Sequence, residues 1–309
     1  MHRMESEFAV RQCGHPPPNL VLRRDPRRPS RLLMRAGIMV LVIAHLCSCS
    51  GVFFQPMRSW VRTPADIGLR YEDVRIQAAD GSTLSAWFLP AQQQKANATL
   101  LFLHGNGQNI STHIAAVHWL PARGFNVLLL DYRGYGASDG RPTVAGAQED
   151  IDSAMRYLLA RGDIDNNPII VLAQSLGGAL GLHYVAHSAY RDHIRAVIID
   201  SAFVGYRDIA REKLQRSWLT WLFAVPLSLT VTDDFRPIDA APKIAPIPLL
   251  LIHGNRDIVV PVHHSEWLYD AAQQPKEVWI VPNVGHIQSL GQTEVRERLI
   301  TWLQIQLAK

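Results

Sequence analysis

Six short runs of almost uninterrupted apolar residues constrain the fold of this chain more than any other feature. They occupy residues 99–103, 126–130, 169–173, 196–199, 249–252 and 278–281. Strands that are buried on both faces have this pattern, because helices cover both faces of a parallel sheet. Helical patterns lie between or after the runs, at about 110–122, 144–161, 177–189, 263–273 and 292–307. The alternation predicts an α/β fold with a doubly wound, mostly parallel sheet.

A hairpin is expected before the first of these runs. Residues 71–77 alternate apolar and polar side chains, and residues 83–89 follow after an Ala-Asp-Gly-Ser turn signal at 79–82. This pattern is typical of two antiparallel strands.

With 48% apolar residues, the chain has enough material for a large core, which excludes global disorder.

Residues 203–245 interrupt the alternation, because they separate two expected strands by about forty positions. The segment contains Trp218, Trp221 and Phe223, and Pro226 breaks its apolar run. We expect a helical lid over a substrate pocket, with Trp218 and Trp221 helping to form an apolar site for an acyl chain. The alternative is an ordinary crossover helix with a long loop.

The N-terminal part differs in composition from the rest. Residues 1–48 hold eight Arg and three acidic residues, a net charge of +5, whereas the whole chain carries +4, which leaves −1 for residues 49–309. A nearly neutral body gives no electrostatic footprint for nucleic acid, so we expect no nucleic-acid partner. All three cysteines, Cys13, Cys47 and Cys49, precede residue 50, so the body has no thiolate chemistry.

An arginine-rich stretch leads into an apolar segment at 36–46, which is too short to span a bilayer and is typical of an export signal. The following Leu-Cys-Ser-Cys at 46–49 resembles a bacterial lipoprotein cleavage box, with Cys49 as the lipidated residue. We therefore expect residues 1–49 to be an extension with an export signal, 50–66 a tether, and 67–309 the folded domain. The predicted location is the membrane of an exporting bacterium, at the outer membrane or the periplasmic face. The alternatives are a signal segment that stays uncleaved and anchors the protein, and simple secretion without a lipid.

The run at 169–173 stops at Gln174-Ser175-Leu176-Gly177-Gly178, and a helical pattern follows. This arrangement predicts a nucleophile elbow, in which a strained turn lifts a serine hydroxyl above the sheet. Residues two before and two after the serine must be small, and Ala173 replaces the usual glycine at the first of these positions.

A serine nucleophile needs a base, and the base needs an acid that orients it. Asp257 follows the run at 249–252, and His286 follows the run at 278–281, in the Ser-acid-His order of this kind of site. Loops at the carboxyl ends of parallel strands meet at one edge of a sheet. Ser175, Asp257 and His286 are therefore the predicted catalytic residues, and Asp200, which ends the run at 196–199, is the rival acid.

Acyl transfer also requires donors for the developing oxyanion. The backbone N–H of Leu176 is one candidate. The other is the N–H of Asn106, in the His104-Gly105-Asn106-Gly107 turn after the first apolar run. We expect His104 to be structural.

Two further histidine pairs suggest no metal site. His183 and His187 have zinc-pair spacing but lack the glutamate of the zinc-protease helix motif. His263 and His264 begin an expected helix and are predicted to lie at the surface. We expect neither a metal nor a cofactor.

These motifs together resemble the alpha/beta-hydrolase superfamily, in the branch with serine aminopeptidase-like and monoglyceride-lipase-like hydrolases. The resemblance covers about residues 71–307. Its carriers are the turn at 104–107, the Asp-Tyr-Arg-Gly-Tyr-Gly-Ala-Ser segment at 131–138, the elbow at 174–178, the segment at 253–257 and Gly285-His286. The resemblance implies a serine hydrolase that works through an acyl-enzyme, in a branch that contains esterases, lipases, thioesterases and peptidases. The apolar insertion and the absence of a charged cluster for a peptide terminus favour esters or thioesters of small acyl or lipid-like molecules. An amidase or aminopeptidase on the same triad, and a non-catalytic binding lipoprotein, are the alternatives.

Overall fold

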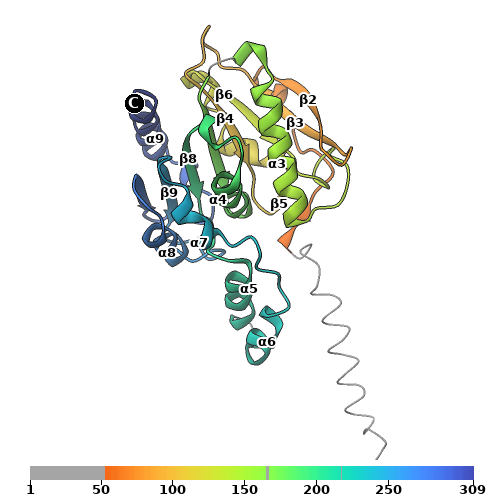
Figure 1. Cartoon of the computed structure of the whole chain (residues 1–309), viewed down its shortest axis with the longest axis vertical. Coiled ribbons are helices and arrows are strands. Elements are labelled where there is room, and N and C mark those ends of the chain that lie inside the picture. The colour runs from red at the N-terminus through yellow and green to blue at the C-terminus, as the bar shows by residue number, and fades with distance from the viewer. Residues whose placement is uncertain (1–52, 165–166, 217) are drawn as a thin grey trace, which may run out of the picture. The chain divides into compact units, whose positions relative to one another are not determined.

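The computed structural model describes residues 53–164, 167–216 and 218–309. Its centre is an eight-stranded sheet with the order β10-β9-β8-β7-β4-β6-β3-β2 (Figure 1). The strands are β2 (Glu72–Gln77), β3 (Thr83–Leu89), β4 (Ala98–Leu103), β6 (Phe125–Leu130), β7 (Ile169–Gln174), β8 (Ile194–Asp200), β9 (Leu249–Gly254) and β10 (Lys276–Val281). Strand β3 runs antiparallel to β2 and β6, and the other adjacent pairs are parallel. The expected hairpin and all six apolar runs are strands of this sheet.

Helices cover both faces of the sheet, so the predicted doubly wound α/β fold is confirmed. One core cluster contains residues of α3 (Val144–Leu159), α4 (Leu176–His187) and α8 (His263–Ala271). A second core cluster contains residues of α2 (Ile110–His113) and α9 (Thr293–Leu307). The central strands β4, β6, β7 and β9 are buried along their whole length because apolar side chains meet helices on both sides.

The helix expected at 110–122 is shorter in the structure. Helix α2 ends at His113 and continues in 3₁₀ turns at Ile114–Ala116 and Pro121–Arg123. Pro121 has no N–H for an α-helical hydrogen bond, so the regular helix cannot extend through it.

The first described residues pack on the domain, whereas a tether was expected at 50–66. Strand β1 (Gln55–Pro56) pairs in parallel with β5 (Gly107–Gln108), and Phe54 is buried. Trp60 meets Trp87 of β3 edge to face, with 5.2 Å between ring centroids. Aromatic packing therefore holds residues 53–60 against the domain instead of leaving them as a spacer.

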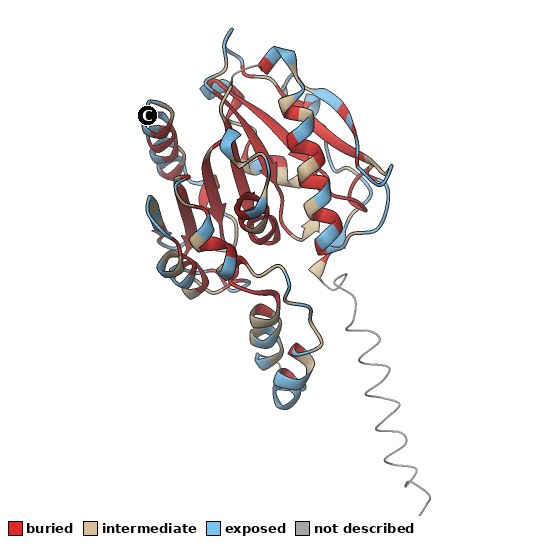
Figure 2. Cartoon of the chain, viewed as in Figure 1, coloured by how far each residue is buried: buried red, intermediate tan, exposed pale blue. Residues whose placement is uncertain are grey.

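A helical insertion lies between β8 and β9. It contains α5 (Tyr206–Gln215), a 3₁₀ turn at Trp221–Phe223, α6 (Ala224–Ser228), α7 (Pro237–Ala240) and a 3₁₀ turn at Ala241–Lys243. Helices α5 and α6 project beyond the sheet, whereas α7 packs against α4 and α8 (Figure 1). The projecting part is mostly exposed or half-buried (Figure 2). Among the described helices, none is long and apolar enough to cross a membrane.

Candidate active site

Ser175 occupies a strained turn between β7 and α4. Its backbone angles are φ 54° and ψ −117°, a conformation that a side-chain-bearing residue rarely adopts. The N–H of Ser175 donates to the carbonyl of Asp200 at 2.9 Å, which ties the turn to β8. Because the strand stops and the helix starts at this residue, the hydroxyl lies at the carboxyl edge of the sheet.

Small residues let α4 pack closely behind this turn. A Cβ atom on Gly177 would lie 2.3 Å from the carbonyl oxygen of Leu103, so any side chain there would clash with backbone. A Cβ on Gly181 would lie 3.3 Å from the Cβ of Ala173. Because Gly181 has no side chain, α4 leaves room for the methyl group of Ala173. Alanine in place of the usual glycine at position 173 is therefore compatible with the elbow.

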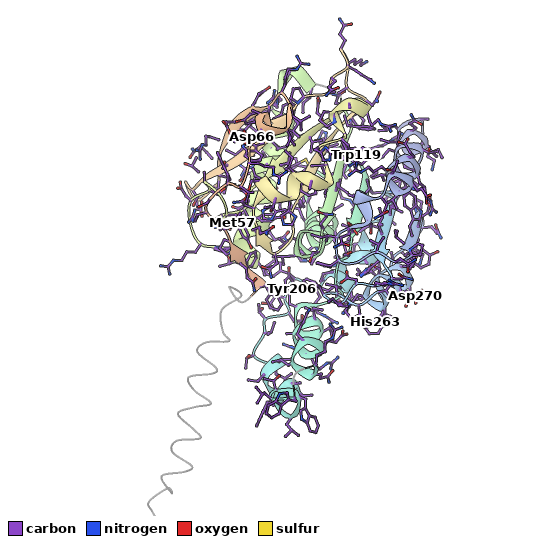
Figure 3. All side chains as sticks on the ribbon, turned by 180° about the vertical axis from the view of Figure 1, so that it is seen from behind. Met57, Asp66, Trp119, Tyr206, His263 and Asp270 are labelled. Atoms are coloured by element: carbon purple, nitrogen blue, oxygen red, sulfur yellow. The ribbon has the colours of Figure 1, made fainter. Side chains whose placement is uncertain are left out.

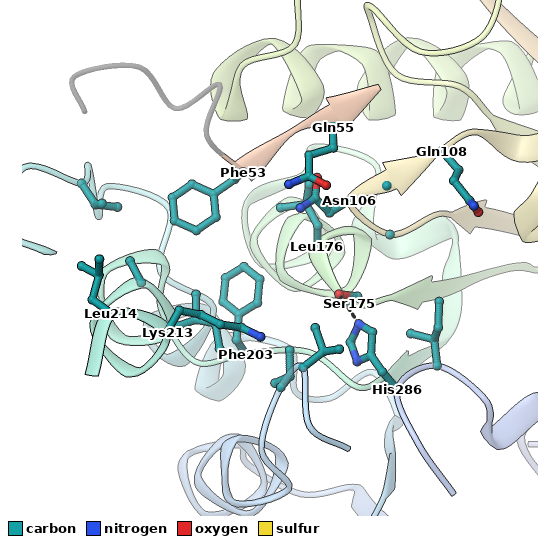
Figure 4. Close-up of a pocket in the computed structure, with 18 of the residues that line it drawn as sticks. Phe53, Gln55, Asn106, Gln108, Ser175, Leu176, Phe203, Lys213, Leu214 and His286 are labelled. Atoms are coloured by element: carbon teal, nitrogen blue, oxygen red, sulfur yellow. Dashed lines mark hydrogen bonds between the residues drawn. The ribbon is translucent and has the colours of Figure 1, made fainter. Parts of the chain in front are cut away.

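Ser175, His286 and Asp257 form a continuous hydrogen-bonded chain, and Figure 4 shows its link between Ser175 and His286. The Oγ of Ser175 lies 2.9 Å from Nε2 of His286, and Nδ1 of His286 lies 2.7 Å from Oδ2 of Asp257. A carboxylate only accepts, so Nδ1 carries the imidazole proton and Nε2 is left to accept from the serine hydroxyl. The sequence prediction that these three residues meet agrees with this arrangement.

Asp257 is held as a carboxylate by the groups around it. Burial alone would raise its pKa, but hydrogen bonds from His253 and His286 outweigh that cost and hold the pKa well below its usual range. The N–H groups of Val259 and Val260 each donate to Oδ1 at 2.8 Å. His253 supports the site, and its role was not predicted, although it follows the apolar run at 249–252 and so lies at the sheet edge where the site forms.

The rival acid Asp200 has different partners. Its carboxylate accepts from the side-chain amide of Gln174 at 2.9 Å and from the Ser201 hydroxyl at 3.1 Å. It is fully buried, and this burial raises its pKa. Its hydrogen bonds hold the ends of β7 and β8 together, whereas no hydrogen bond joins it to His286 among the described residues.

The two predicted oxyanion donors lie next to the serine. Leu176 and Asn106 both line the same cavity as Ser175 and His286. A Cβ on Gly105 would lie 3.4 Å from the Cβ of Ser175, so the 104–107 turn approaches the nucleophile closely. Within the described chain, neither the Leu176 N–H nor the Asn106 N–H donates to another protein group. Both donors are available to a bound molecule.

The segment that follows β6 holds this turn in place. The Tyr135 hydroxyl donates to the carbonyl of Asn106 at 2.5 Å, and the Tyr132 hydroxyl donates to the carbonyl of His104 at 3.2 Å. Asp131 accepts from the N–H of Ile110 at 3.0 Å. The expected structural role of His104, which is fully buried, agrees with these contacts.

A cavity of about 670 Å³ opens above Ser175. Its apolar lining comes from the insertion, from the first described residues and from the loops at the sheet edge: Phe53, Phe203, Ile209, Leu214, Leu227, Val231, Val259 and Ile287. Lys213 of α5 also lines the cavity, and its ammonium points inward (Figure 4). Phe53 and Lys213 were not predicted, because nothing in the local sequence shows which residues of distant segments share a cavity.

Trp218 and Trp221 do not line this cavity, contrary to expectation. Trp218 is 80% exposed and Trp221 is 57% exposed, and both lie on the outside of the insertion. The inner wall comes instead from residues of α5 and from Leu227 of α6. The apolar run in the sequence could not show which of its side chains face the cavity and which face outward.

Glu212, His263 and His264 form a cluster that could be considered for a metal ion. His264 is fully buried, so its predicted surface position is wrong; α8 packs it beneath the insertion. The Nδ1 of His264 accepts from the N–H of Val204 at 3.3 Å, which places the proton of the neutral ring on Nε2, and Nε2 lies 3.3 Å from Glu212. A proton on Nε2 favours an interaction with the carboxylate over a metal ligand. These contacts join α5 to α8, where Tyr206 and His263 mark the junction (Figure 3).

Known proteins share this fold and much of this sequence. A family model described as serine aminopeptidase, S33, matches residues 94–238. The protein YfhR of Escherichia coli (strain K12) is 36% identical over 238 residues, which cover 75% of this chain and 80% of the relative. The alpha/beta hydrolase domain-containing protein WAV2 of Arabidopsis thaliana is 34% identical over 229 residues, which cover 71% of this chain and 73% of the relative.

The solved structure of the Pyrococcus furiosus esterase Pf2001 matches with a TM-score of 0.66 and 22% identity, covering 83% of this chain and 97% of the esterase. At this identity the likeness speaks for the fold alone. The fold and the site together define the class of protein as a hydrolase. Its candidate catalytic residues lie at the carboxyl edge of a mostly parallel sheet. On the relatives' similarity, the chain belongs to the alpha/beta-hydrolase superfamily.

Proposed function

We propose that this protein is a serine hydrolase that cleaves carboxylic esters or thioesters through an acyl-enzyme. The observation that carries the proposal is the hydrogen-bonded chain from Ser175 through His286 to Asp257, at the floor of a largely apolar cavity. A serine that only stabilised the turn would not need a histidine and a buried carboxylate aligned behind it.

In the first half-reaction, Ser175 Oγ bonds to the substrate carbonyl carbon while its proton moves to His286 Nε2. The carbonyl oxygen becomes an oxyanion that the Leu176 and Asn106 N–H groups stabilise. The carbonyl re-forms as the bond to the alcohol or thiol oxygen or sulfur breaks, and His286 returns the proton to this leaving group. In the second half-reaction, water attacks the carbonyl carbon of the acyl-enzyme while His286 takes its proton. The bond to Ser175 Oγ then breaks, the acid leaves, and His286 returns the proton to Ser175.

Esters are favoured over peptides with a free amino terminus by the charges at the site. Recognition of an α-ammonium group requires a carboxylate, and no acidic residue is among the described residues that line the cavity. Lys213 places a positive charge there instead, which repels an ammonium group. An aminopeptidase is therefore the weaker candidate.

We propose further that α5 and α6 act as a lid. Ile209 and Leu214 of α5, with Leu227 of α6, form one wall of the cavity, while the opposite faces of both helices are exposed. This wall would exclude water from the acyl chain of a bound substrate. Because it belongs to an inserted segment, it can do so without altering the sheet edge that holds the catalytic residues.

The test is hydrolysis of a panel of 4-nitrophenyl esters of graded acyl chain length, with Ser175→Ala as the control. We expect release of 4-nitrophenolate by the wild type and loss of it in the variant, with the fold retained by circular dichroism. Equal turnover by both proteins would exclude Ser175 as the nucleophile. A folded wild-type protein that hydrolyses none of the esters would favour the alternative of a non-catalytic binding protein.

We also propose that the protein is exported and carries lipid on Cys49, which lies outside the described residues. The apolar segment at 36–46 and the Leu-Cys-Ser-Cys sequence support this localisation. Labelled palmitate should tag the wild type in growing cells, and Cys49→Ala should lose both the tag and the membrane fraction. Cytoplasmic wild-type protein with residues 36–46 uncleaved would contradict the proposal.

A further inference from the structure

The outer end of the insertion carries an unusually exposed apolar surface, which we name the lid tip and define as residues 218–229. Trp218, at 80% exposure, is its most open member. The exposed apolar side chains of the lid tip are Trp218, Leu219, Trp221, Leu222, Phe223, Val225 and Leu229. Scattered exposed apolar residues are ordinary, but so many within twelve consecutive positions mark an interaction surface.

The side chains of the lid tip and their neighbours indicate the kind of partner. Tryptophan is enriched where an apolar phase meets water, and tryptophan, phenylalanine and leucine form the apolar faces of helices that lie in the membrane interface. Two exposed cations, Arg211 and Arg216, precede the lid tip, and Arg211 also contacts Asp208 at 3.3 Å. An apolar, aromatic edge flanked by positive charge fits the surface of a bilayer that contains anionic lipids.

If Cys49 carries lipid, as proposed above, the start of the described chain brings the same end of the domain near the membrane. Phe53 packs edge to face on Tyr206, the first residue of α5, with 5.2 Å between ring centroids. Cys49 precedes Phe53 by four residues, so even a fully extended chain reaches only about 14 Å between them. Because residues 53–60 are packed on the domain, a lipid on Cys49 would hold this end close to the bilayer.

We propose that the lid tip docks into the interfacial region of an anionic bilayer. Trp218, Trp221 and Leu222 enter the boundary between headgroups and acyl chains, and Arg211 and Arg216 remain among the anionic headgroups. The inner faces of α5 and α6 line the cavity above Ser175. With the lid tip in the bilayer, a lipid-like molecule would pass between these helices and the sheet edge to enter the cavity. The docking itself does not depend on ester hydrolysis and can be tested without turnover.

The test uses the full chain with Cys49→Ala, which lacks the acyl anchor, and vesicles of phosphatidylcholine mixed with phosphatidylglycerol. In this background, Trp218→Ser/Trp221→Ser is compared with Ile305→Ser. Ile305 is 52% exposed on α9, at the far end of the molecule from the lid tip (Figure 1), and is the matched control for loss of an exposed apolar side chain. All variants carry the same N-terminal segment, so its contribution to sedimentation with vesicles cancels.

We expect the double serine variant to lose at least about 30-fold in vesicle partitioning, since each tryptophan transfers a large apolar surface out of water. Ile305→Ser should partition like its parent. Trp218→Phe/Trp221→Phe should still bind, but its tryptophan fluorescence should no longer be quenched by brominated lipids, which places the contact at the lid tip.

Three outcomes would overturn the proposal: a parent protein that does not bind vesicles, a double serine variant that binds as well as its parent, or quenching that persists in the phenylalanine variant. A parent that dimerises in sedimentation equilibrium without binding vesicles, and a serine variant that is monomeric, would assign the lid tip to a second copy of the chain and also overturn it.

Discussion

The carboxylate of Asp257 lies 2.7 Å from Nδ1 of His286, opposite the ring nitrogen that meets Ser175. This relationship fixes which imidazole nitrogen carries the proton. Asp257→Asn should lower kcat by about 10⁴-fold, because an amide can present its NH₂ group to Nδ1 and favour the wrong tautomer. Asp200→Asn, at the site of the rival acid, should cost much less. A larger loss for Asp200→Asn in steady-state kinetics would reverse the assignment.

Acyl-chain selectivity should depend on the inner wall of the insertion. Each additional buried CH₂ contributes about 0.8 kcal/mol, so kcat/KM should rise about fourfold per carbon over the first few carbons and then level off. Leu227→Ala should flatten this rise because Leu227 lines the cavity, whereas Trp221→Ala should leave it unchanged with soluble esters. A flat profile in the wild type would remove the case for an acyl pocket.

The charge of Lys213 should select among esters. Its ammonium points into a largely apolar cavity and forms no salt bridge with any described residue (Figure 4). Lys213→Met should lower kcat/KM about tenfold more for an ester with a carboxylate at the end of its acyl chain than for the neutral ester of equal length. Equal losses for the two esters would show that Lys213 acts only through packing.

Much of the fold and of the candidate site could be predicted from local sequence. The apolar runs gave the strands because burial on both faces leaves no room for polar alternation. The elbow could be located because a strand, a serine and small residues must occur in that order, and Gly177 shows why: its Cβ would lie 2.3 Å from a backbone oxygen.

Other features depend on long-range contacts that no local pattern encodes. Residues 53–60 contain Pro56 and follow the predicted export signal, so they resemble a spacer, yet Trp60 packs on Trp87 of β3. His264 begins a helix and was expected at the surface, but the inserted α5 covers it. In both cases the deciding partner is far away in the sequence.

The stability of the fold should depend on the ionisation of Asp131. Burial raises the pKa of this carboxyl from 3.8 to about 7. In the folded state it therefore keeps a proton that the unfolded chain has already lost, so its contribution to stability is complete below 3.8 and declines as pH rises through about 7. Asp131→Asn is neutral at every pH and should show a smaller fall in the free energy of unfolding across this window.

The measurement is urea denaturation of the wild type and of Asp131→Asn at several pH values between those two limits. The variant retains a side-chain amide that can donate to Nε2 of His104, which lies 3.5 Å from the Asp131 carboxylate. Parallel stability curves for the two proteins would mean that Asp131 is ionised in the folded state throughout.

Covalent labelling by a fluorophosphonate probe tests the central claim most directly, because the probe reacts only with a serine whose hydroxyl is activated by its neighbours. We predict that the wild type is labelled at Ser175, that Ser175→Ala is not labelled, and that His286→Ala is labelled far more slowly although it keeps the serine. Peptide mapping by mass spectrometry identifies the modified residue. An unlabelled wild type with an intact fold, or a Ser175→Ala protein labelled as fast as the wild type, would contradict the account.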